Sequence, residues 1–407
     1  MKLPYIALAL WLFINVFYFY FICISLFALK RPREFPEAKP KSRFAVVVPA
    51  RNEEAVISRL IDSLTAQDYP RELYDIYAIP NNCTDDTAGA ARRAGAAILT
   101  CSYPVKCKGD ALRQAFAQLL SSPKHYDAFC VFDADNIVDS RFLSQMNRAF
   151  CAGARVAKAR DEALNPRASW ISGCYAIYFT MFNLFFNRAR DSCGLSPGVR
   201  GTGFAVHRSV LLENGGWHTV TMTEDIEFSA QCALMGERVY WVDGAVTWDE
   251  QPNSFRISMN QRRRWCSGSM QVAELHMADL RKRAHERNGR LSFDFICYLL
   301  VPYIQAFSVV PVLLVLLHGI MMGKIVLLHV LWLLGGGFLF TSLLTAAAGW
   351  FMVLYIGEEP GLMWRSIVAF PFFMVTWLPL QIISLFQKTT VWKEVRHNGG
   401  VLPEKAA

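Results

Sequence analysis

Two long apolar blocks on either side of a polar region constrain the fold more than any other feature of this sequence. Residues 3–29 contain no charged side chain, and this stretch is long enough for a transmembrane helix and longer than the core of a signal peptide. Residues 293–388 are again mainly apolar, and we expect further spans at about 294–321, 325–356 and 362–387. The sequence therefore predicts a polar domain that helices on both sides hold at a cell membrane.

Basic residues indicate on which side of the membrane the polar domain lies. Only Lys2 precedes the first apolar block, whereas six Lys and Arg residues lie between positions 30 and 43. By the positive-inside rule, the N-terminus is then outside and the polar domain is cytoplasmic. Three later spans would leave the C-terminus outside, opposite its basic tail at 389–407. Either one span is miscounted or one segment is re-entrant, and the glycines at 335–337 mark a candidate break.

The net charge of +8 does not by itself indicate a nucleic-acid-binding protein. The basic residues lie beside the apolar blocks, which favours an anionic membrane surface or phosphate ligands, so we predict no nucleic-acid partner. The 11 cysteines form no C-x-x-C pair. The sequence therefore predicts neither a disulfide framework nor a zinc site.

The polar region, about residues 42–250, shows strand patterns that alternate with helical ones. Buried-strand patterns such as RFAVVVPA and YDIYAIP are each followed by a polar turn and a helical pattern. This alternation predicts an α/β domain with a mostly parallel sheet and helices on both faces. Ligands of such sheets bind at the carboxyl ends of the strands, where the turns PARNEE, NNCTDD and DADN lie.

One aromatic segment inside this region, residues 169–187, is nearly long enough to span a membrane. A crossing there would separate the acids of DADN from the acids of the later sequence TED. We therefore predict a helix that lies at the membrane interface or packs under the spans, with an ordinary core helix as the alternative.

The sequence DAD places Asp133 and Asp135 directly after an apolar strand pattern. Two carboxylates at the end of a buried strand are costly unless a cation lies beside them. Mg²⁺ or Mn²⁺ is usually held by one or two carboxylates together with substrate phosphates. The motif therefore predicts a metal site, with an N-cap and turn pair as the alternative.

Seven motifs occur in one order along the chain: VVVPARNEE, NNCTDDT, KGDALRQAF, DAD, GTGF, TED and QRRRW. This ordered set resembles the membrane-embedded inverting glycosyltransferases of family 2, which include cellulose, chitin, hyaluronan and poly-N-acetylglucosamine synthases. The resemblance implies a GT-A nucleotide-diphospho-sugar transferase domain plus an α-helical transmembrane region. It divides the chain into an N-terminal transmembrane helix (1–30), a cytosolic GT-A domain (42–250), Q-x-x-R-W and interfacial helices (251–292), C-terminal transmembrane helices (293–388) and a tail (389–407).

The resemblance also implies which residues bind the donor, a UDP-sugar. Asp135 and Asp133 are expected to hold the metal, which bridges the two phosphates. Asn81 departs from the family pattern, in which an Asp usually stands, although its amide oxygen can still accept a hydrogen bond from uracil. The expected donor-binding residues are Pro49, Ala50, Glu53, Asn81, Lys108, Gly109, Asp133 and Arg264.

A second group of residues is expected to act on the acceptor. Asp225, in the motif Thr223–Glu224–Asp225, is the expected base that deprotonates an acceptor hydroxyl for in-line attack on C1 of the sugar. The alternative is a helix start with Thr223 as N-cap and acids in the first turn, and both interpretations can hold together. The expected catalytic residues are therefore Asp225, Glu224 and Thr223, and the expected acceptor-binding residues are Gly201, Thr202, Gly203, Gln261 and Trp265.

Two basic segments carry predictions about the membrane side of the site. Arg262 and Arg263 occupy the variable positions of the Q-x-x-R-W motif and are expected to face lipid headgroups. The tail sequence VWKEVRH, residues 391–397, resembles a short aromatic-basic segment that some members place beside the active site. If it does so here, the C-terminus is cytoplasmic.

We therefore expect a membrane-bound hexosyltransferase that uses a UDP-sugar and Mg²⁺ or Mn²⁺ and acts on a glycan or lipid acceptor at the bilayer. Processive synthesis of a β-linked polysaccharide is the main prediction, because Q-x-x-R-W accompanies processive chain growth in many relatives. The alternative is a non-processive glycolipid synthase. A transporter is disfavoured because the predicted spans within 294–387 contain almost no intramembrane ionisable side chain, the exceptions His318 and Lys324 lying near a predicted turn. A glycoside hydrolase would not need the metal and phosphate motifs.

Overall fold

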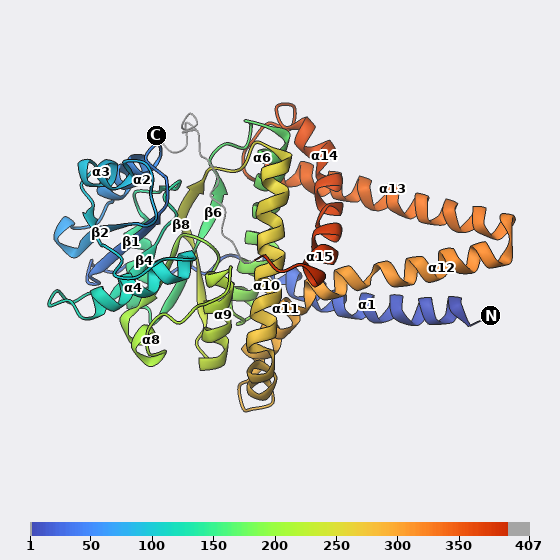
Figure 1. Ribbon diagram of the computed structural model, residues 1–407, viewed down its shortest axis with the longest axis horizontal. Helices are drawn as coiled ribbons and strands as arrows, with labels where there is room; N and C mark the ends of the chain where they lie inside the picture. The colour runs from blue at the N-terminus through green and yellow to red at the C-terminus, as the bar shows by residue number, and fades with distance from the viewer. Residues whose placement is uncertain (1, 390–407) are drawn as a thin grey trace.

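Eight strands form one sheet at the centre of the polar region in a computed structural model, which describes residues 2–389 (Figure 1). The strands are β1 (Phe44–Ala50), β2 (Tyr74–Pro80), β3 (Ala97–Ile98), β4 (Ala128–Val131), β5 (Ile137–Val138), β6 (Val156–Ala163), β7 (Phe204–His207) and β8 (Val239–Asp249). Their order across the sheet is β3-β2-β1-β4-β7-β6-β8-β5. Four of the seven pairings are parallel, and the pairings β4–β7, β6–β7 and β5–β8 are antiparallel. The sheet is therefore mixed, with its longest parallel part in the strands expected from the sequence.

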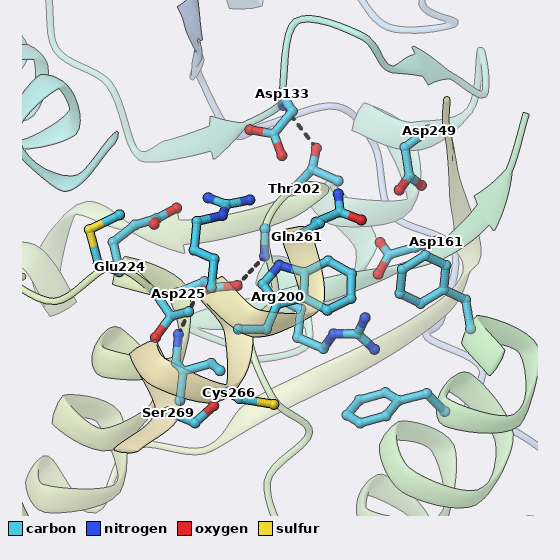
Figure 2. Close-up of a pocket in the computed structure, with 18 of the residues that line it drawn as sticks. Asp133, Asp161, Arg200, Thr202, Glu224, Asp225, Asp249, Gln261, Cys266 and Ser269 are labelled. Carbon is cyan, nitrogen blue, oxygen red and sulfur yellow. Dashed lines mark hydrogen bonds between the residues drawn. The ribbon is translucent and has the colours of Figure 1, made fainter. Parts of the chain in front are cut away.

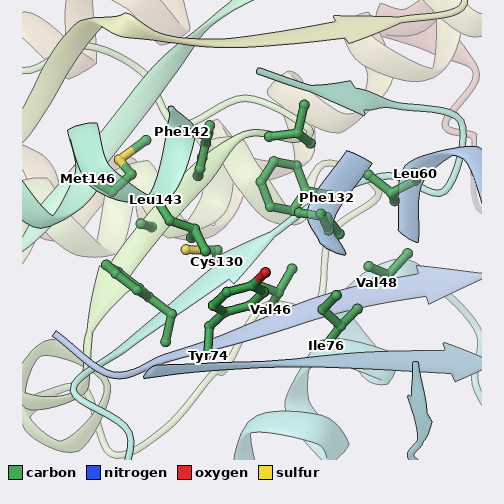
Figure 3. Close-up of a cluster of buried hydrophobic side chains, with 14 of the residues drawn as sticks. Val46, Val48, Leu60, Tyr74, Ile76, Cys130, Phe132, Phe142, Leu143 and Met146 are labelled. Atoms are coloured by element: carbon green, nitrogen blue, oxygen red, sulfur yellow. The ribbon is translucent and has the colours of Figure 1, made fainter. Parts of the chain in front are cut away.

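Helices cover both faces of this sheet. Alternate residues of a strand point to opposite faces, and both sets are apolar in β1, so each face needs a covering layer. Val46 and Val48 of β1 pack against α2 (Ile57–Thr65), α3 (Thr87–Arg93) and α5 (Phe142–Cys151) (Figure 3). The intervening residues Ala45 and Val47 pack on the other face against α4 (Lys108–Leu120), α8 (Arg208–Glu213) and α9 (Glu224–Met235). A short 3₁₀ turn, η2 (Arg71–Leu73), precedes β2.

Strands β1, β2 and β4 are parallel neighbours, so their carboxyl ends lie at one edge of the sheet. Val131, the last residue of β4, pairs with Val47 in the middle of β1, and Pro80 pairs with Ala50 at the ends of β2 and β1. The polar turns that follow these three strands therefore meet, as expected for a ligand edge.

Three long helices project together from this domain: α1 (Leu3–Ser25), α12 (Val309–Met322) and α13 (Lys324–Tyr355) (Figure 1). The 3₁₀ turn η1 (Leu26–Leu29) extends α1, and α11 (Arg290–Phe307) leads into α12. Helix α13 runs unbroken through the glycines at 335–337, so the break expected there is wrong. Within residues 2–389, four helical segments are long and apolar enough to cross a membrane: Leu3–Leu29, Arg290–Met322, Lys324–Tyr355 and Trp364–Phe386.

The last of these four segments runs across the projecting helices instead of beside them. It consists of α14 (Trp364–Val375) and α15 (Trp377–Phe386), which lie along α6 (Trp170–Met181) and the 30-residue helix α10 (Phe255–Ala284) (Figure 1). This arrangement positions α14 and α15 as a wall of the pocket described below.

Arg262 of α10 is fully buried and stabilises the junction of α14 and α15. Its Nη1 donates to the carbonyl of Phe373 (3.0 Å) and to Oγ1 of Thr376 (2.8 Å), where α14 ends. The expectation that Arg262 faces lipid headgroups is therefore wrong, because the unpaired carbonyls at a helix end attract a cation. Arg263 hydrogen-bonds to Oε1 of Gln387 at the end of α15.

The aromatic segment at 169–187 is a buried helix that packs under α14. Ser169 and Ser172 form a capping box at the start of α6. A Cβ at Gly173 would collide with Ser366, so glycine allows α6 and α14 to pack closely. The segment continues as a π-helical turn, η3 (Phe182–Arg188), and as α7 (Ala189–Ser192).

Candidate functional site

A pocket of about 540 Å³ lies at the carboxyl edge of β1, β2 and β4 and continues between the helices of the apolar region. Acidic residues line one end of it (Figure 2), and aromatic and aliphatic side chains line the other. The structure brings every residue that the sequence assigned to the site to this pocket except Gly109 and Gly203. Their individual roles stay predictions.

Gly109 and Gly203 support the pocket from behind. A Cβ at Gly109 would lie 2.5 Å from Oγ1 of Thr219, so glycine lets the start of α4 approach that turn. Gly203 has φ of +61°, a backbone conformation that glycine adopts without strain. Both glycines therefore set the path of the backbone next to residues that do line the pocket.

Lys108, at the first turn of α4, joins three loops of the acidic end. Its Nζ lies 2.6 Å from Oδ1 of Asp133, 3.3 Å from Oε1 of Glu224 and 2.5 Å from the carbonyl oxygen of Gly201. Burial opposes the charge of Lys108, but the charges of Asp133 and Glu224 outweigh it and raise its pKa. A permanent cation is therefore positioned beside the first acid of DAD.

Glu224 is an unusual carboxyl group in this end of the pocket. It is buried, with 6% of its surface exposed. Burial, together with the negative charges of Asp225 and Asp133, raises its pKa to about 7 despite the neighbouring Lys108. Glu224 is therefore a group that changes protonation close to neutral pH.

Asp225 lies in the first turn of α9, where backbone N–H groups favour an anion. Its Oδ2 accepts a hydrogen bond from the backbone N–H of Gly201 (2.5 Å), and its Oδ1 accepts one from the N–H of Ile226 (2.8 Å). Thr223 stands at the N-cap position but makes no capping hydrogen bond, and its Oγ1 is buried without a partner among residues 2–389. Two backbone N–H groups therefore fix the orientation of Asp225, and this residue lines the pocket.

Three acids line a second side of the pocket, and sequence reasoning missed two of them. Asp161 of β6 and Asp249 of β8 lie there (Figure 2). Asp135 also lines the pocket. Burial and the charges of Asp161 and Asp135 raise the pKa of Asp249 well above its usual range. Fully buried Lys158 pairs with Asp161. Asp249 is the last residue of strand β8, so its sequence signal is the same as that of DAD: an acid at the end of an apolar strand pattern.

The donor set of this site fits a hard divalent cation. Asp133 and Asp135 offer carboxylate oxygens to one pocket, and the ammonium group of Lys108 shows that Asp133 accepts a cation. Among residues 2–389, no group of three His, Cys, Asp or Glu side chains has a metal-binding arrangement. Two carboxylates plus ligand phosphates is the usual coordination of Mg²⁺ in sites of this kind.

Asn81 has a different arrangement from the one expected. Its Oδ1 accepts hydrogen bonds from Nε (3.3 Å) and Nη2 (3.1 Å) of Arg51, and its Nδ2 donates to the carbonyls of Ala50 and Ile79. The amide therefore fixes Arg51, a pocket residue that the sequence analysis did not single out. An Asp at position 81 would lack the two N–H donors, which gives a physical reason for Asn here.

Helix α10 supplies Gln261, Arg264 and Trp265 to the pocket from one face. Oε1 of Gln261 accepts a hydrogen bond from the hydroxyl of Tyr175 (2.8 Å), and the ring of Trp265 stacks against that of Trp377 at 6.3 Å. Arg264 makes no hydrogen bond or ion pair with any described residue, so its guanidinium group is available to a ligand. The tail segment 391–397 lies outside the described residues.

Comparison with known proteins agrees with this architecture. The family model "Glycosyltransferase like family 2" matches residues 40–268, which is more than half of the chain. In a mannosyltransferase from Pyrobaculum calidifontis, PcManGT, solved in complex with GDP-Man and Mn²⁺, the fold is similar, with a TM-score of 0.64 at 18% identity over 95% of this chain and 100% of that one. At this identity the likeness concerns the fold, which is the GT-A fold with added helices that are candidates to span a membrane.

Three relatives illustrate the range of activities among similar sequences. A probable glycosyltransferase of Bacillus subtilis, YdaM, is 25% identical over 69% of this chain and 67% of its own length. A beta-monoglucosyldiacylglycerol synthase of Nostoc is 26% identical over 70% of this chain and 62% of its own length. A poly-beta-1,6-N-acetyl-D-glucosamine synthase of Staphylococcus aureus is 24% identical over 54% of this chain and 53% of its own length. The chain thus matches about half to two thirds of the length of these relatives.

The family match, the strand order and the acidic pocket at the carboxyl edge of the sheet lead to one conclusion: the chain belongs to glycosyltransferase family 2 and is a glycosyltransferase.

Proposed function

We propose that this chain transfers a single hexose, with inversion, from a UDP-sugar to a hydroxyl group of a membrane lipid. One observation carries the proposal: the pocket that contains Asp133, Asp135 and Asp225 is lined at its other end by the apolar helices. The lining residues from those helices are Tyr18, Phe21, Tyr298, Val301, Pro302, Gln305, Met374, Trp377 and Gln381. An acceptor that reaches Asp225 from this end is surrounded by apolar and aromatic side chains, which suits a lipid.

The donor is proposed to bind at the carboxyl edge of β1, β2 and β4, with its diphosphate between the DAD turn and Arg264. UDP follows from the motif resemblance, and the neighbour PcManGT, solved with a nucleotide diphospho-sugar and Mn²⁺, supports this class of donor. Asp133 and Asp135 would hold Mg²⁺ or Mn²⁺. When bound, the metal neutralises negative charge on the diphosphate as it leaves.

The residues on the other side of the pocket would carry the transfer. Asp225 accepts the proton of the acceptor hydroxyl as the oxygen forms its bond to C1 of the sugar. The bond between C1 and the phosphate oxygen breaks on the opposite side, and its electron pair leaves with UDP. The N–H of Gly201 holds Asp225 in the orientation that this step requires. Lys108 keeps the Gly201 turn beside the DAD turn.

The projecting helices favour a single transfer over processive export. A polysaccharide crossing a membrane needs a path that helices enclose. Within residues 2–389, the apolar window of α13 has no buried residue, and those of Leu3–Leu29 and Arg290–Met322 are 11% and 17% buried. Helices so widely exposed suit contact with lipid, and the Nostoc relative is named for the synthesis of a glycolipid.

The same helices suggest a topology with three crossings. If α1, α12 and α13 cross the bilayer, then α14 and α15 lie along its surface beside α10. Three crossings place the N-terminus outside and the C-terminus on the side of the catalytic domain. This count removes the conflict between the predicted spans and the basic tail, and it is consistent with a cytoplasmic domain.

Processive polysaccharide synthesis is the second candidate, and one feature favours it. The stacked rings of Trp265 and Trp377 lie in the pocket, and aromatic rings are suited to bind sugar faces. The Staphylococcus relative is named as a polysaccharide synthase.

Product analysis with the full chain in lipid vesicles tests both candidates. A panel of UDP-sugars is offered with Mg²⁺ or Mn²⁺, UDP release is measured, and the labelled product is separated by size and by lipid extraction. We expect one labelled lipid that is absent with the Asp225→Asn variant. A ladder of water-soluble oligosaccharides would support the second candidate instead, and failure to release UDP from every donor would contradict both.

A further inference from the structure

Arg200 is a cation in the pocket that the mechanism above does not use. It precedes the GTGF turn and lies in the pocket with Asp225 and Asp161 (Figure 2). Its guanidinium carbon lies 4.0 Å from the ring centre of Phe182 and 4.8 Å from that of Phe179. The two rings hold the faces of the guanidinium group and leave its N–H edges for a ligand.

Within the described part of the chain, these N–H edges have no partner. Arg200 makes no side-chain hydrogen bond and no ion pair, and its Nη1 is buried. Arg190 and Lys158, which are fully buried, are matched instead: Arg190 forms a two-bond ion pair with Asp294, and Lys158 pairs with Asp161. Arg200 as a whole is only half-buried, but a buried N–H group such as its Nη1 is costly without a partner. The arrangement therefore points to an anion that arrives with a substrate.

The position of Arg200 favours the acceptor as the source of this anion. The next residue, Gly201, donates its N–H to Asp225, so Arg200 is adjacent in sequence to the contact that orients the proposed base. Its side chain extends to Phe179 and Phe182, which belong to the aromatic end of the pocket. The donor phosphates have their own proposed cations, which are the metal and Arg264.

We propose that Arg200 binds an anionic group in the headgroup of the acceptor lipid, close to the hydroxyl that receives the sugar. The site then selects an anionic lipid with a free hydroxyl over a neutral one such as diacylglycerol. A phosphate is the favoured group, because guanidinium N–H groups match two of its oxygens. This inference rests on the proposed lipid acceptor, and Arg200 forms or breaks no covalent bond in it.

The test compares two acceptors with the full chain in phosphatidylcholine vesicles, at saturating donor. Phosphatidylglycerol offers a phosphate and free hydroxyls, and diacylglycerol offers a hydroxyl without charge. For the wild type we expect a KM at least about tenfold lower for phosphatidylglycerol, since a hydrogen bond to a charged group contributes roughly 1.5–3 kcal/mol. Arg200→Gln is expected to raise this KM about 10- to 100-fold, with the donor KM and the KM for diacylglycerol changed less than about threefold.

Two further variants control for charge and for folding. Arg256→Gln removes an exposed arginine of α10 outside the pocket, and both acceptor KM values are expected to stay as in the wild type. Arg200→Lys keeps the positive charge but loses the paired N–H donors of the guanidinium group. We expect its KM for phosphatidylglycerol to lie between those of the wild type and Arg200→Gln. Thermal unfolding midpoints are compared for all variants, and binding of phosphatidylglycerol without donor gives a readout that is independent of turnover.

Several outcomes would overturn the inference. In the wild type, equal use of the two lipids would do so. An Arg200→Gln variant that raises the KM of the UDP-sugar would assign Arg200 to the donor. Glycosylation of soluble glycerol 1-phosphate as efficiently as of phosphatidylglycerol would show that phosphate is recognised without a lipid. Transfer to diacylglycerol alone would leave the proposed function standing and refute this inference, whereas no lipid product at all would refute both.

Discussion

The ammonium group of Lys108 lies 3.3 Å from Oε1 of Glu224, at the point where three loops of the pocket meet. Even so, the pKa of Glu224 is raised to about 7, because the carboxyl group is buried and because Asp225 and Asp133 are also close. The positive charge of Lys108 thus offsets the repulsion among the carboxyl groups of Asp133, Glu224 and Asp225.

The raised pKa predicts that Glu224 lowers the stability of the folded state by an amount that depends on pH. In the unfolded chain the carboxyl group has a pKa near 4.5, so between about pH 4.5 and 7 the unfolded state releases a proton that the folded state retains. The unfolded state binds fewer protons in that window, so stability falls as the pH rises and the loss is complete above about pH 7. The Glu224→Gln variant has no ionisable group at this position and therefore lacks this loss of stability.

Thermal unfolding of both proteins between pH 5 and 8 measures the effect. Relative to the wild type, Glu224→Gln is expected to gain apparent stability as the pH rises, by about 1–3 kcal/mol at most. Glu237→Gln is a poor control, because Glu237 pairs with Arg155, whereas exposed Glu72→Gln is suitable. A difference between Glu224→Gln and the wild type that does not vary with pH would contradict the assignment.

Much of the fold was predictable because its signals are local. The strand patterns of β1, β2 and β4 each end in a polar turn, so the sequence located the ligand edge and the residues on it. The antiparallel strand β7 was not predictable in this way, because its four residues pair with β4 and β6 only through distant contacts.

Sequence reasoning missed Arg200 and misplaced Arg262 because the surroundings of both residues depend on tertiary packing. Arg262, which lies outside the pocket, stands next to other arginines in the sequence, and only the junction of α14 and α15 shows why it is buried. Arg200 shows its unpaired N–H group only once Phe179 and Phe182 are placed. Composition likewise identified residues 362–387 as apolar but could not give their direction.

Asp225→Asn is predicted to separate donor binding from transfer. The amide keeps the shape of the side chain and its contact with Gly201 but accepts a proton poorly, so kcat is expected to fall about 10²- to 10⁴-fold. Affinity for the UDP-sugar, measured by calorimetry, should change less than about threefold. Transfer at the wild-type rate would show that another group is the base.

Asp135→Asn is predicted to weaken the binding of metal together with UDP. Loss of a carboxylate ligand from a site with two of them should lower Mn²⁺ affinity by at least about tenfold, as titration of Mn²⁺ in the presence of UDP can measure. Asp68→Asn, at an exposed position outside the pocket, is the matched control. Unchanged Mn²⁺ affinity in Asp135→Asn would remove this residue from the metal site.

Gly268→Ala is predicted to disturb catalysis from behind the site. A Cβ at this position would lie 2.6 Å from Oγ1 of Thr223, so α10 must move away from the start of α9. Because Gln261, Arg264 and Trp265 lie on α10, kcat is expected to fall about 10- to 100-fold through misplacement of these groups. Gly335→Ala in α13 serves as the control, because a Cβ added there would meet no atom of the described residues within 4 Å outside its own stretch of helix. Full activity of Gly268→Ala would show that the contact tolerates a methyl group.

The crosswise direction of α14 and α15 predicts that both of their ends lie on one side of the membrane. Glu359 precedes α14 and Lys388 follows α15, and both side chains are exposed, as is that of Lys324, the first residue of α13. In intact cells, a membrane-impermeant thiol reagent should label Lys324→Cys but neither Glu359→Cys nor Lys388→Cys until the membrane is opened. The parent chain, with its 11 cysteines, gives the background. Labelling of Glu359→Cys and Lys388→Cys from opposite sides would mean that α14 and α15 cross the bilayer, and the three-crossing topology would then be wrong.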